Sequence, residues 1–222
     1  MMQESASILL VEGDADKLFF ERICRFLDVS TQIKVAPPKE FGQSSNTKGT
    51  VFSLLPTLFG QMADGSLRRF AVIVDADTAE NNGMGYRKTA DRFAECADTF
   101  GYKRVQRKGQ SGGIIFESND GLSDIGLWVM PDNRREGYLE DWIKDCIISA
   151  EKNLFNLAVD TVKALPTPRK FKNIHQTKSE VATWLAWQKV PGQGPHGASM
   201  ELLDREAQPF RTLTDWLRRI FT

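Results

Sequence analysis

Two short acidic clusters contain the residues of this chain that are best suited to chemistry. Glu12 and Asp16 lie just after one apolar run, and Asp75 and Asp77 lie just after another. Residues that follow parallel strands meet at the carboxyl edge of an α/β sheet, where ligand sites form. Carboxylates that crowd together repel one another unless a cation lies among them. Mg²⁺ or Mn²⁺ fits such a cluster, because both are hard ions that prefer oxygen ligands.

The elements expected to position these carboxylates alternate along the chain of 222 residues. Apolar runs predict strands at 6–12, 32–35, 70–75, 113–116 and 125–130. Helical spacing predicts helices between the first three strands, at about 86–100, at 138–150 and in the remainder of the chain. This order predicts an α/β fold with a mostly parallel sheet, helices on both faces and a C-terminal helical layer.

We expect an α/β domain over residues 1–150 and a helical C-terminal extension, residues 151–222, packed on it. The formal net charge is +0, but the first range has 18 basic and 22 acidic residues and the second has 11 and 7. A basic part beside an acidic metal-binding part can hold a polyanion, although chance explains such a difference equally well. Three widely spaced cysteines, the lack of a secretory signal and the lack of a membrane-length apolar run predict a cytoplasmic protein without membrane contact.

Glu12-Gly13 after the first strand and Asp75-Ala76-Asp77 after a later one resemble the Toprim domain. This domain is the metal-binding module of topoisomerases, bacterial primases and OLD-type nucleases. The Glu-Gly-x-x-Asp form, with Asp16 in the last position, is most similar to the OLD-type branch. The resemblance covers residues 6 to about 145, and the stretches 128–133 and 183–188 are similar to small stand-alone bacterial Toprim proteins. It implies a Toprim-like fold and a site for one or two Mg²⁺ or Mn²⁺ ions.

The resemblance also implies an acidic residue after a later strand and a basic residue beyond it. For the acidic metal ligand, Glu136 is the first candidate and Glu140 the second. For the basic catalytic residue, Lys178 is the first candidate and His175 the second, since a cation there can stabilise charge on a phosphoryl group. An exposed helix face and a solvated basic stretch are the alternative interpretations. For Asp16, the alternative to a metal ligand is a helix cap.

Basic residues near these clusters are candidates for contacts with nucleic-acid phosphates. They are Lys103, Arg104, Arg107, Lys108, Arg134 and Arg135. A solvated charge run is the alternative for the first four of them. The loop 42–50, which contains Lys48, precedes a helix and can cradle a phosphate, but a plain polar loop is the favoured interpretation.

Together these residues predict a metal-dependent phosphodiesterase, a nuclease that hydrolyses DNA or RNA, with Glu12 as metal ligand or as base toward water. One alternative is a non-catalytic Toprim protein that binds nucleic acid or scaffolds a complex. Another is a small-molecule phosphatase with Asp75 as nucleophile. The resemblance further implies a bacterial role in phage defence, with an ABC-type ATPase as a partner in trans. The sequence does not determine the oligomeric state.

Overall fold

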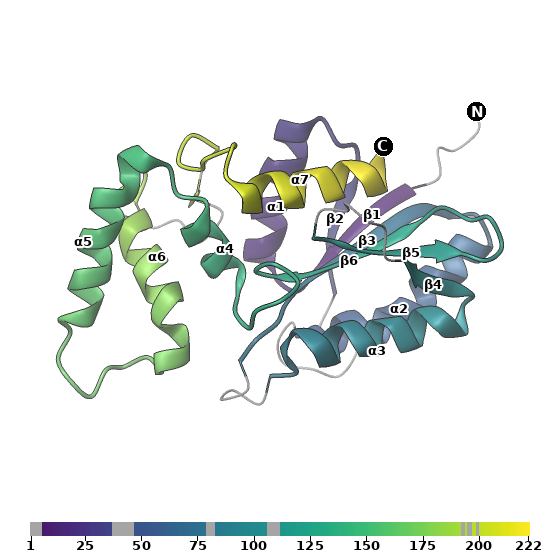
Figure 1. Cartoon of the computed structure of the whole chain (residues 1–222), viewed down its shortest axis with the longest axis horizontal. Coiled ribbons are helices and arrows are strands. Elements are labelled where there is room, and N and C mark those ends of the chain that lie inside the picture. The colour runs from purple at the N-terminus through teal and green to yellow at the C-terminus, as the bar shows by residue number, and fades with distance from the viewer. Residues whose placement is uncertain are drawn as a thin grey trace.

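The computed structural model describes residues 6–36, 47–78, 83–105, 112–191, 194, 197–198 and 200–222. Its centre is a six-stranded sheet in the order β2-β1-β3-β6-β5-β4 (Figure 1). The strands are β1 (Ala6–Val11), β2 (Gln32–Val35), β3 (Leu67–Asp75), β4 (Tyr102–Val105), β5 (Ile114–Ser118) and β6 (Ile125–Met130). The four strands β2, β1, β3 and β6 are parallel, whereas β5 and β4 pair antiparallel with their neighbours. The predicted mostly parallel α/β fold is therefore confirmed.

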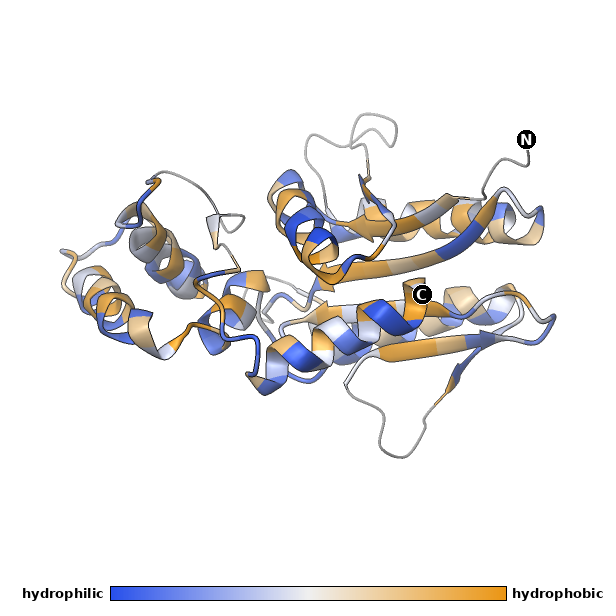
Figure 2. Cartoon of the chain, turned by 90° about the horizontal axis from the view of Figure 1, so that it is seen from above, coloured by the Kyte–Doolittle hydropathy of each residue, from blue (hydrophilic) through white to orange (hydrophobic). Residues whose placement is uncertain are grey.

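The part of the chain described above also contains seven α-helices. They are α1 (Asp14–Leu27), α2 (Lys48–Ala63), α3 (Gly85–Thr99), α4 (Leu139–Asp145), α5 (Lys152–Lys163), α6 (Gln176–Ala186) and α7 (Gln208–Phe221). Helices α1 and α7 cover one face of the sheet, and α2 and α3 cover the other (Figure 1). Figure 2 shows the strands mostly in the colour of hydrophobic residues, as expected when both faces are covered. Within the described residues, no helix is both long and apolar enough to cross a membrane.

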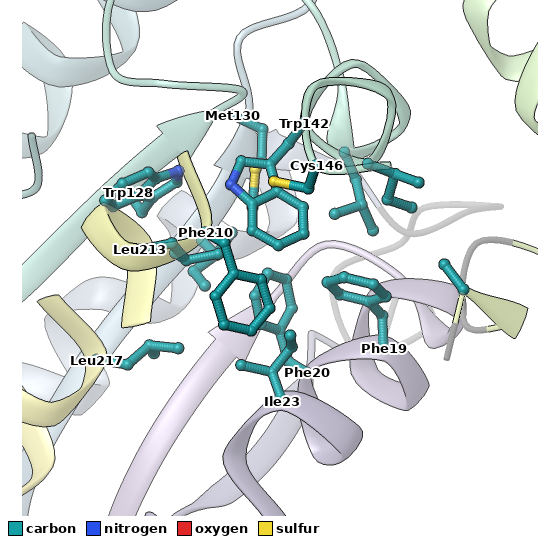
Figure 3. Close-up of a cluster of buried hydrophobic side chains, with 14 of the residues drawn as sticks. Phe19, Phe20, Ile23, Trp128, Met130, Trp142, Cys146, Phe210, Leu213 and Leu217 are labelled. Carbon is teal, nitrogen blue, oxygen red and sulfur yellow. The ribbon is translucent and has the colours of Figure 1, made fainter. Parts of the chain in front are cut away.

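The face under α1 and α7 holds the larger aromatic core, part of which is drawn in Figure 3. Phe19 and Phe20 of α1, Trp142 of α4 and Phe210 of α7 meet there, and none is more than 3% exposed. The aromatic rings of Phe19 and Trp142 lie edge to face, with centroids 5.7 Å apart. Helix α7, from the end of the chain, thus closes the core of the sheet.

Residues 151–222 divide into two parts. Helices α5 and α6 pack on each other beside the sheet, and α6 also contacts α4 (Figure 1). Helix α7 instead lies on the sheet, where the Trp216 indole packs directly over Gly113 and Gly126. A Cβ atom at Gly113 would lie 2.0 Å from Trp216 Cδ1, so only glycine leaves room for this indole. The sequence predicts these helices but not this division of their packing.

Candidate active site

Glu12 and Asp75 lie side by side at the carboxyl ends of β1 and β3, as the sequence predicted. Glu12 is the first residue after β1, and Asp75 is the last residue of β3. The backbone N–H of Asp75 donates to Glu12 Oε1 at 2.8 Å. Asp75 Oδ1 in turn accepts a hydrogen bond of 3.0 Å from the backbone N–H of Leu139, the first residue of α4. These two bonds fix both carboxylates against the backbone of a neighbouring element.

Asp16 and Glu140 contribute two further carboxylates to this group. Asp16 Oδ2 accepts a hydrogen bond of 2.9 Å from the Gly13 N–H, so this side chain does cap α1. Glu140 lies in the first turn of α4 and is only 9% exposed. Burial raises the pKa of Asp75 well above its usual value, and the charges of Glu12, Asp16 and Glu140 raise it further. The carboxylate group around Asp75 therefore consists of Glu12, Asp16, Asp75 and Glu140, and Asp77 adjoins it because its charge acts on Glu12.

Burial also raises the pKa values of Glu12, which follows β1, and of Asp16, in the first turn of α1. It raises the pKa of Glu12 from 4.5 to about 7, an effect that Lys48 opposes and Asp77 reinforces. It raises the pKa of Asp16 from 3.8 to about 6, with a smaller contribution from Glu140. A desolvated carboxylate holds its proton unless a cation compensates its charge. The carboxylate group is thus a site where a cation would bind favourably.

Lys178 lies beside this group, as predicted. Its Nζ atom is 3.7 Å from Glu140 Oε2 and 4.0 Å from Asp75 Oδ2. It also lies 4.3 Å from the centre of the Tyr138 ring. Burial lowers the pKa of Lys178, but the charges of Glu140 and Asp75 outweigh burial and raise it. His175, the second candidate, lies three residues before Lys178, just ahead of α6, with its ring centre 6.3 Å from that of Tyr138.

Asp77 faces a second lysine. Its backbone is in the left-handed region (φ 61°) and pairs with Gly137 through two hydrogen bonds of 3.2 Å. Its Oδ2 atom accepts from Lys48 Nζ at 2.7 Å, and this buried ammonium also donates to the Ala76 carbonyl at 3.2 Å. Lys48 therefore belongs to the site, although the sequence only suggested it for a phosphate cradle. Most of that cradle, residues 42–46, is outside the described residues.

The structure does not bring Glu136 into the carboxylate group. Glu136 is exposed, and its Oε1 atom lies beside Gly85, 3.5 Å from where a Cβ atom there would be. The next residue, Gly137, pairs with the backbone of Asp77. This pairing holds Glu136 before the start of α4, outside the carboxylate group. Glu140, the second candidate, takes the buried position instead.

The predicted nucleic-acid contacts are placed at different distances from the site. Lys103 and Arg104 lie on β4, three strands from β3, or about 14 Å at ~4.8 Å per strand. Lys103 pairs with Asp98, and Arg104 donates to the Tyr86 hydroxyl at 3.2 Å. Arg107 and Lys108 lie outside the described residues.

Arg134 and Arg135 follow β6, the neighbour of β3, and are therefore closer to the carboxylate group. Arg135 bridges Asp132 and Asp145 through two ion pairs. The Arg134 side chain is exposed. Of the four predicted nucleic-acid contacts that the structure describes, Arg134 is thus the best placed to meet a polymer that reaches the site.

The carboxylate group has the donor chemistry for a hard divalent ion, since all its ligating atoms are oxygens. Within the described ranges, however, no three Asp, Glu, His or Cys side chains are already arranged to hold a metal ion. Two ammonium groups lie in contact with the acidic residues instead: Lys178 with Asp75 and Glu140, and Lys48 with Asp77. A metal ion would fit if these carboxylates turned toward a common point.

Fold and site together define an α/β protein with buried carboxylates at the ends of adjacent parallel strands. The chain belongs to the family DUF3226, described as a protein of unknown function, whose model matches residues 6–222. This range runs from β1 through α7, so the family includes the helices that follow the sheet. Neither a curated protein nor a solved structure matches the chain significantly.

Proposed function

We propose that this protein is a Toprim-like, Mg²⁺- or Mn²⁺-dependent phosphodiesterase that hydrolyses DNA or RNA. The observation that supports this most is the contact between Glu12 and Asp75 at adjacent strand ends, with Lys178 beside them. Buried carboxylates with strongly raised pKa values cluster at functional sites. The order of the acidic residues along the chain, and their convergence at one sheet edge, agree with the Toprim resemblance.

In this proposal, Glu12, Asp75 and either Asp16 or Glu140 hold the divalent ion. Such an ion, when bound, would activate water and stabilise the leaving oxygen of a phosphodiester. The pKa of about 7 belongs to Glu12 in the metal-free protein, so the ion would displace a proton from this carboxylate when it binds near the pH of the cell. Lys178 would stabilise the negative charge that develops on the phosphoryl group. Its position over the Tyr138 ring limits the directions in which its ammonium can move.

Cleavage assays test this proposal directly. The substrates are plasmid, linear duplex, single-stranded DNA, tRNA and a small phosphate ester, each with Mn²⁺, with Mg²⁺ and with EDTA. The variants are Glu12→Gln and Asp75→Asn, and Glu95→Gln, an exposed residue of α3, is the matched control. We expect metal-dependent cleavage of a nucleic acid by the wild type and the control, and at least a 100-fold loss in the other two. Turnover of the phosphate ester alone would instead favour a phosphatase that uses Asp75.

A second candidate function is metal-independent binding of nucleic acid by a non-catalytic Toprim-like protein. The observation that favours it is the pairing of Asp77 with Lys48 and of Glu140 with Lys178, which already compensates acidic charge. This function predicts DNA or RNA binding that is equal in EDTA and in Mn²⁺, without cleavage. Titration with Mn²⁺ followed by electron paramagnetic resonance separates the two candidates, because only the first requires the ion to bind.

We also propose a cytoplasmic location, a partner ATPase of the ABC type and a role in phage defence, all of which rest on the resemblance. Co-expression with ATPases encoded beside this protein, followed by co-purification and a phage infection assay, tests the partner and the role. Asp75→Asn should keep the complex and lose protection if the nuclease activity is what protects the cell.

A further inference from the structure

The two lysines at the site divide its acidic residues between them. The charge of Lys178 acts on three of these residues, which are Asp16, Asp75 and Glu140. Lys48 instead contacts Asp77, and its charge acts on Glu12. Helix α2, which carries Lys48, covers one face of the sheet, whereas α6, which carries Lys178, lies beside the sheet (Figure 1). The site therefore has an Asp75 half and an Asp77 half, each with one ammonium group, and Glu12 lies between them.

The two ammonium groups are held in different ways. Lys178 Nζ lies 3.7 and 4.0 Å from its two carboxylate partners, and its side chain is 37% exposed. Lys48 Nζ lies 2.7 Å from Asp77 Oδ2 and donates a second hydrogen bond of 3.2 Å to the Ala76 carbonyl, and its side chain is only 8% exposed. An exposed ion pair is weak, whereas separation of a buried pair leaves its charges without compensation. The Lys178 ammonium is thus loosely held, and the Lys48 ammonium is fixed against Asp77.

Lys48 and Asp77 both occupy positions that their residue types disfavour. Lys48 is the first residue of α2, where the positive end of the helix dipole repels a cation, and none of the described residues in the first turn of α2 is acidic. Asp77 has a left-handed backbone (φ 61°), which is uncommon for any residue other than glycine. Such local conflicts are found mostly at functional sites. The contact between these two residues therefore points to a role in the site.

We propose that the site binds one divalent ion, in the Asp75 half, and that the Lys48 ammonium takes the place beside Asp77 that a second ion would need. Two-metal sites hold their ions about 3.5–4 Å apart, close enough for one carboxylate to contact both. Glu12 has the position of such a carboxylate, because it accepts from the Asp75 N–H and also feels the charge of Lys48.

Lys48 is then a positioning residue. It holds Asp77, which the sequence predicted as a metal ligand, away from the ion and supplies a fixed positive charge beside Glu12. The inference rests on the proposed function for the presence of a divalent ion, and it adds the number of ions and the role of Asp77.

A count of bound ions tests the inference without any cleavage. Electron paramagnetic resonance of free Mn²⁺ during a titration gives the number of ions per chain and their dissociation constants. We expect one ion for the wild type and for Lys48→Arg, which keeps the positive charge beside Asp77. Lys48→Met should bind a second ion, because it leaves the Asp77 carboxylate and the Ala76 carbonyl available as oxygen ligands. Lys88→Met, at an exposed lysine of α3, is the control and should bind one ion.

A double variant separates this role from a purely structural one. Lys48→Met combined with Asp77→Asn removes both charges of the pair, so the net charge of the site stays as in the wild type. We expect this variant to bind one ion again, with an affinity within about threefold of the wild type, whereas Asp75→Asn should weaken the binding of that ion at least about tenfold. Circular dichroism spectra confirm that each variant is folded. If Lys48→Met does not fold, the counts for the wild type and the double variant decide.

Two ions bound by the wild type, or a single ion bound by folded Lys48→Met, would overturn the inference. Loss of the ion in the double variant would also overturn it, because Asp77 would then be one of the ligands of that ion. A wild type that binds no ion would overturn both the inference and the metal-dependent function. One bound ion without cleavage of any substrate would refute only the proposed nuclease, whereas two bound ions with cleavage would refute only the inference.

Discussion

Replacement of the buried Glu12 by glutamine should stabilise the metal-free protein at alkaline pH. Burial in the folded protein raises the pKa of Glu12 from 4.5 to about 7. Above pH 7, Glu12 therefore carries a negative charge that its buried position disfavours. This difference corresponds to about 3 kcal/mol at 1.36 kcal/mol per pH unit. Solvent reaches part of the side chain, so we expect a gain of about 1–3 kcal/mol. Glutamine keeps an oxygen that can accept the hydrogen bond from the Asp75 N–H.

The sign of the effect follows from proton linkage. Between pH 4.5 and pH 7 the folded protein binds more protons at Glu12 than the unfolded chain does, so wild-type stability falls as pH rises. The gain from Glu12→Gln should therefore be small at pH 5 and complete at pH 8. Urea unfolding in EDTA at both pH values measures it, with Glu95→Gln as the control, which should change stability by less than 0.5 kcal/mol. An equal effect of Glu12→Gln at both pH values, or a loss of stability at pH 8, would refute this reasoning.

Three further predictions concern activity and packing. At limiting Mn²⁺, the cleavage rate should rise from pH 6 to pH 8 and then level off, because Asp16 and Glu12 lose their protons at about pH 6 and pH 7. A cleavage rate that falls over this range would contradict the prediction. Lys178→Met should lower the cleavage rate at least tenfold, because it removes the charge that would stabilise the phosphoryl group. The circular dichroism spectrum should stay unchanged, because the Lys178 side chain is 37% exposed. Lys178→Arg should recover part of the rate, and full activity of Lys178→Met would exclude that role. Gly113→Ala should destabilise the fold by about 1–3 kcal/mol, since the new Cβ would overlap Trp216; a thermal midpoint within 1 °C of the wild type would show that the indole moves aside.

The acidic ends of β1 and β3 were predictable because the signal is local. An apolar run that ends at a carboxylate gives both the strand and the residue that follows it. The rule that parallel strands share a carboxyl edge then places Glu12 beside Asp75, as the hydrogen bond between them confirms. The apolar runs at 113–116 and 125–130 likewise predicted the strands β5 and β6, which pair antiparallel.

Other parts of the site depend on contacts that local patterns do not encode. Lys48 meets Asp77 across 29 positions of the chain, and nothing near Lys48 in the sequence indicates that partner. Whether Glu136 or Glu140 is buried depends on where α4 begins, which the backbone pairing of Gly137 decides. The apolar stripes of α6 and α7 suggested that these two helices pack on each other, but the sheet receives the stripe of α7 instead.

Strand β4 was missed because its pattern is short. Only Tyr102 among its four residues is buried, and Lys103 and Arg104 are both exposed. In the sequence these residues form part of a basic run, which is as typical of a solvated loop as of an edge strand. Pairing with β5 is what makes this segment a strand.

The central claim is that the carboxylate group supports metal-dependent cleavage of nucleic acid. The most direct test is the cleavage rate of plasmid, linear duplex, single-stranded DNA and tRNA as a function of Mn²⁺ concentration at pH 8, for the wild type, Asp75→Asn and Glu95→Gln. We predict a rate that rises and saturates with Mn²⁺ in the wild type and the control, and a loss of at least 100-fold in Asp75→Asn. Equal rates in the wild type and Asp75→Asn, or no cleavage by a wild type that binds Mn²⁺, would contradict the claim.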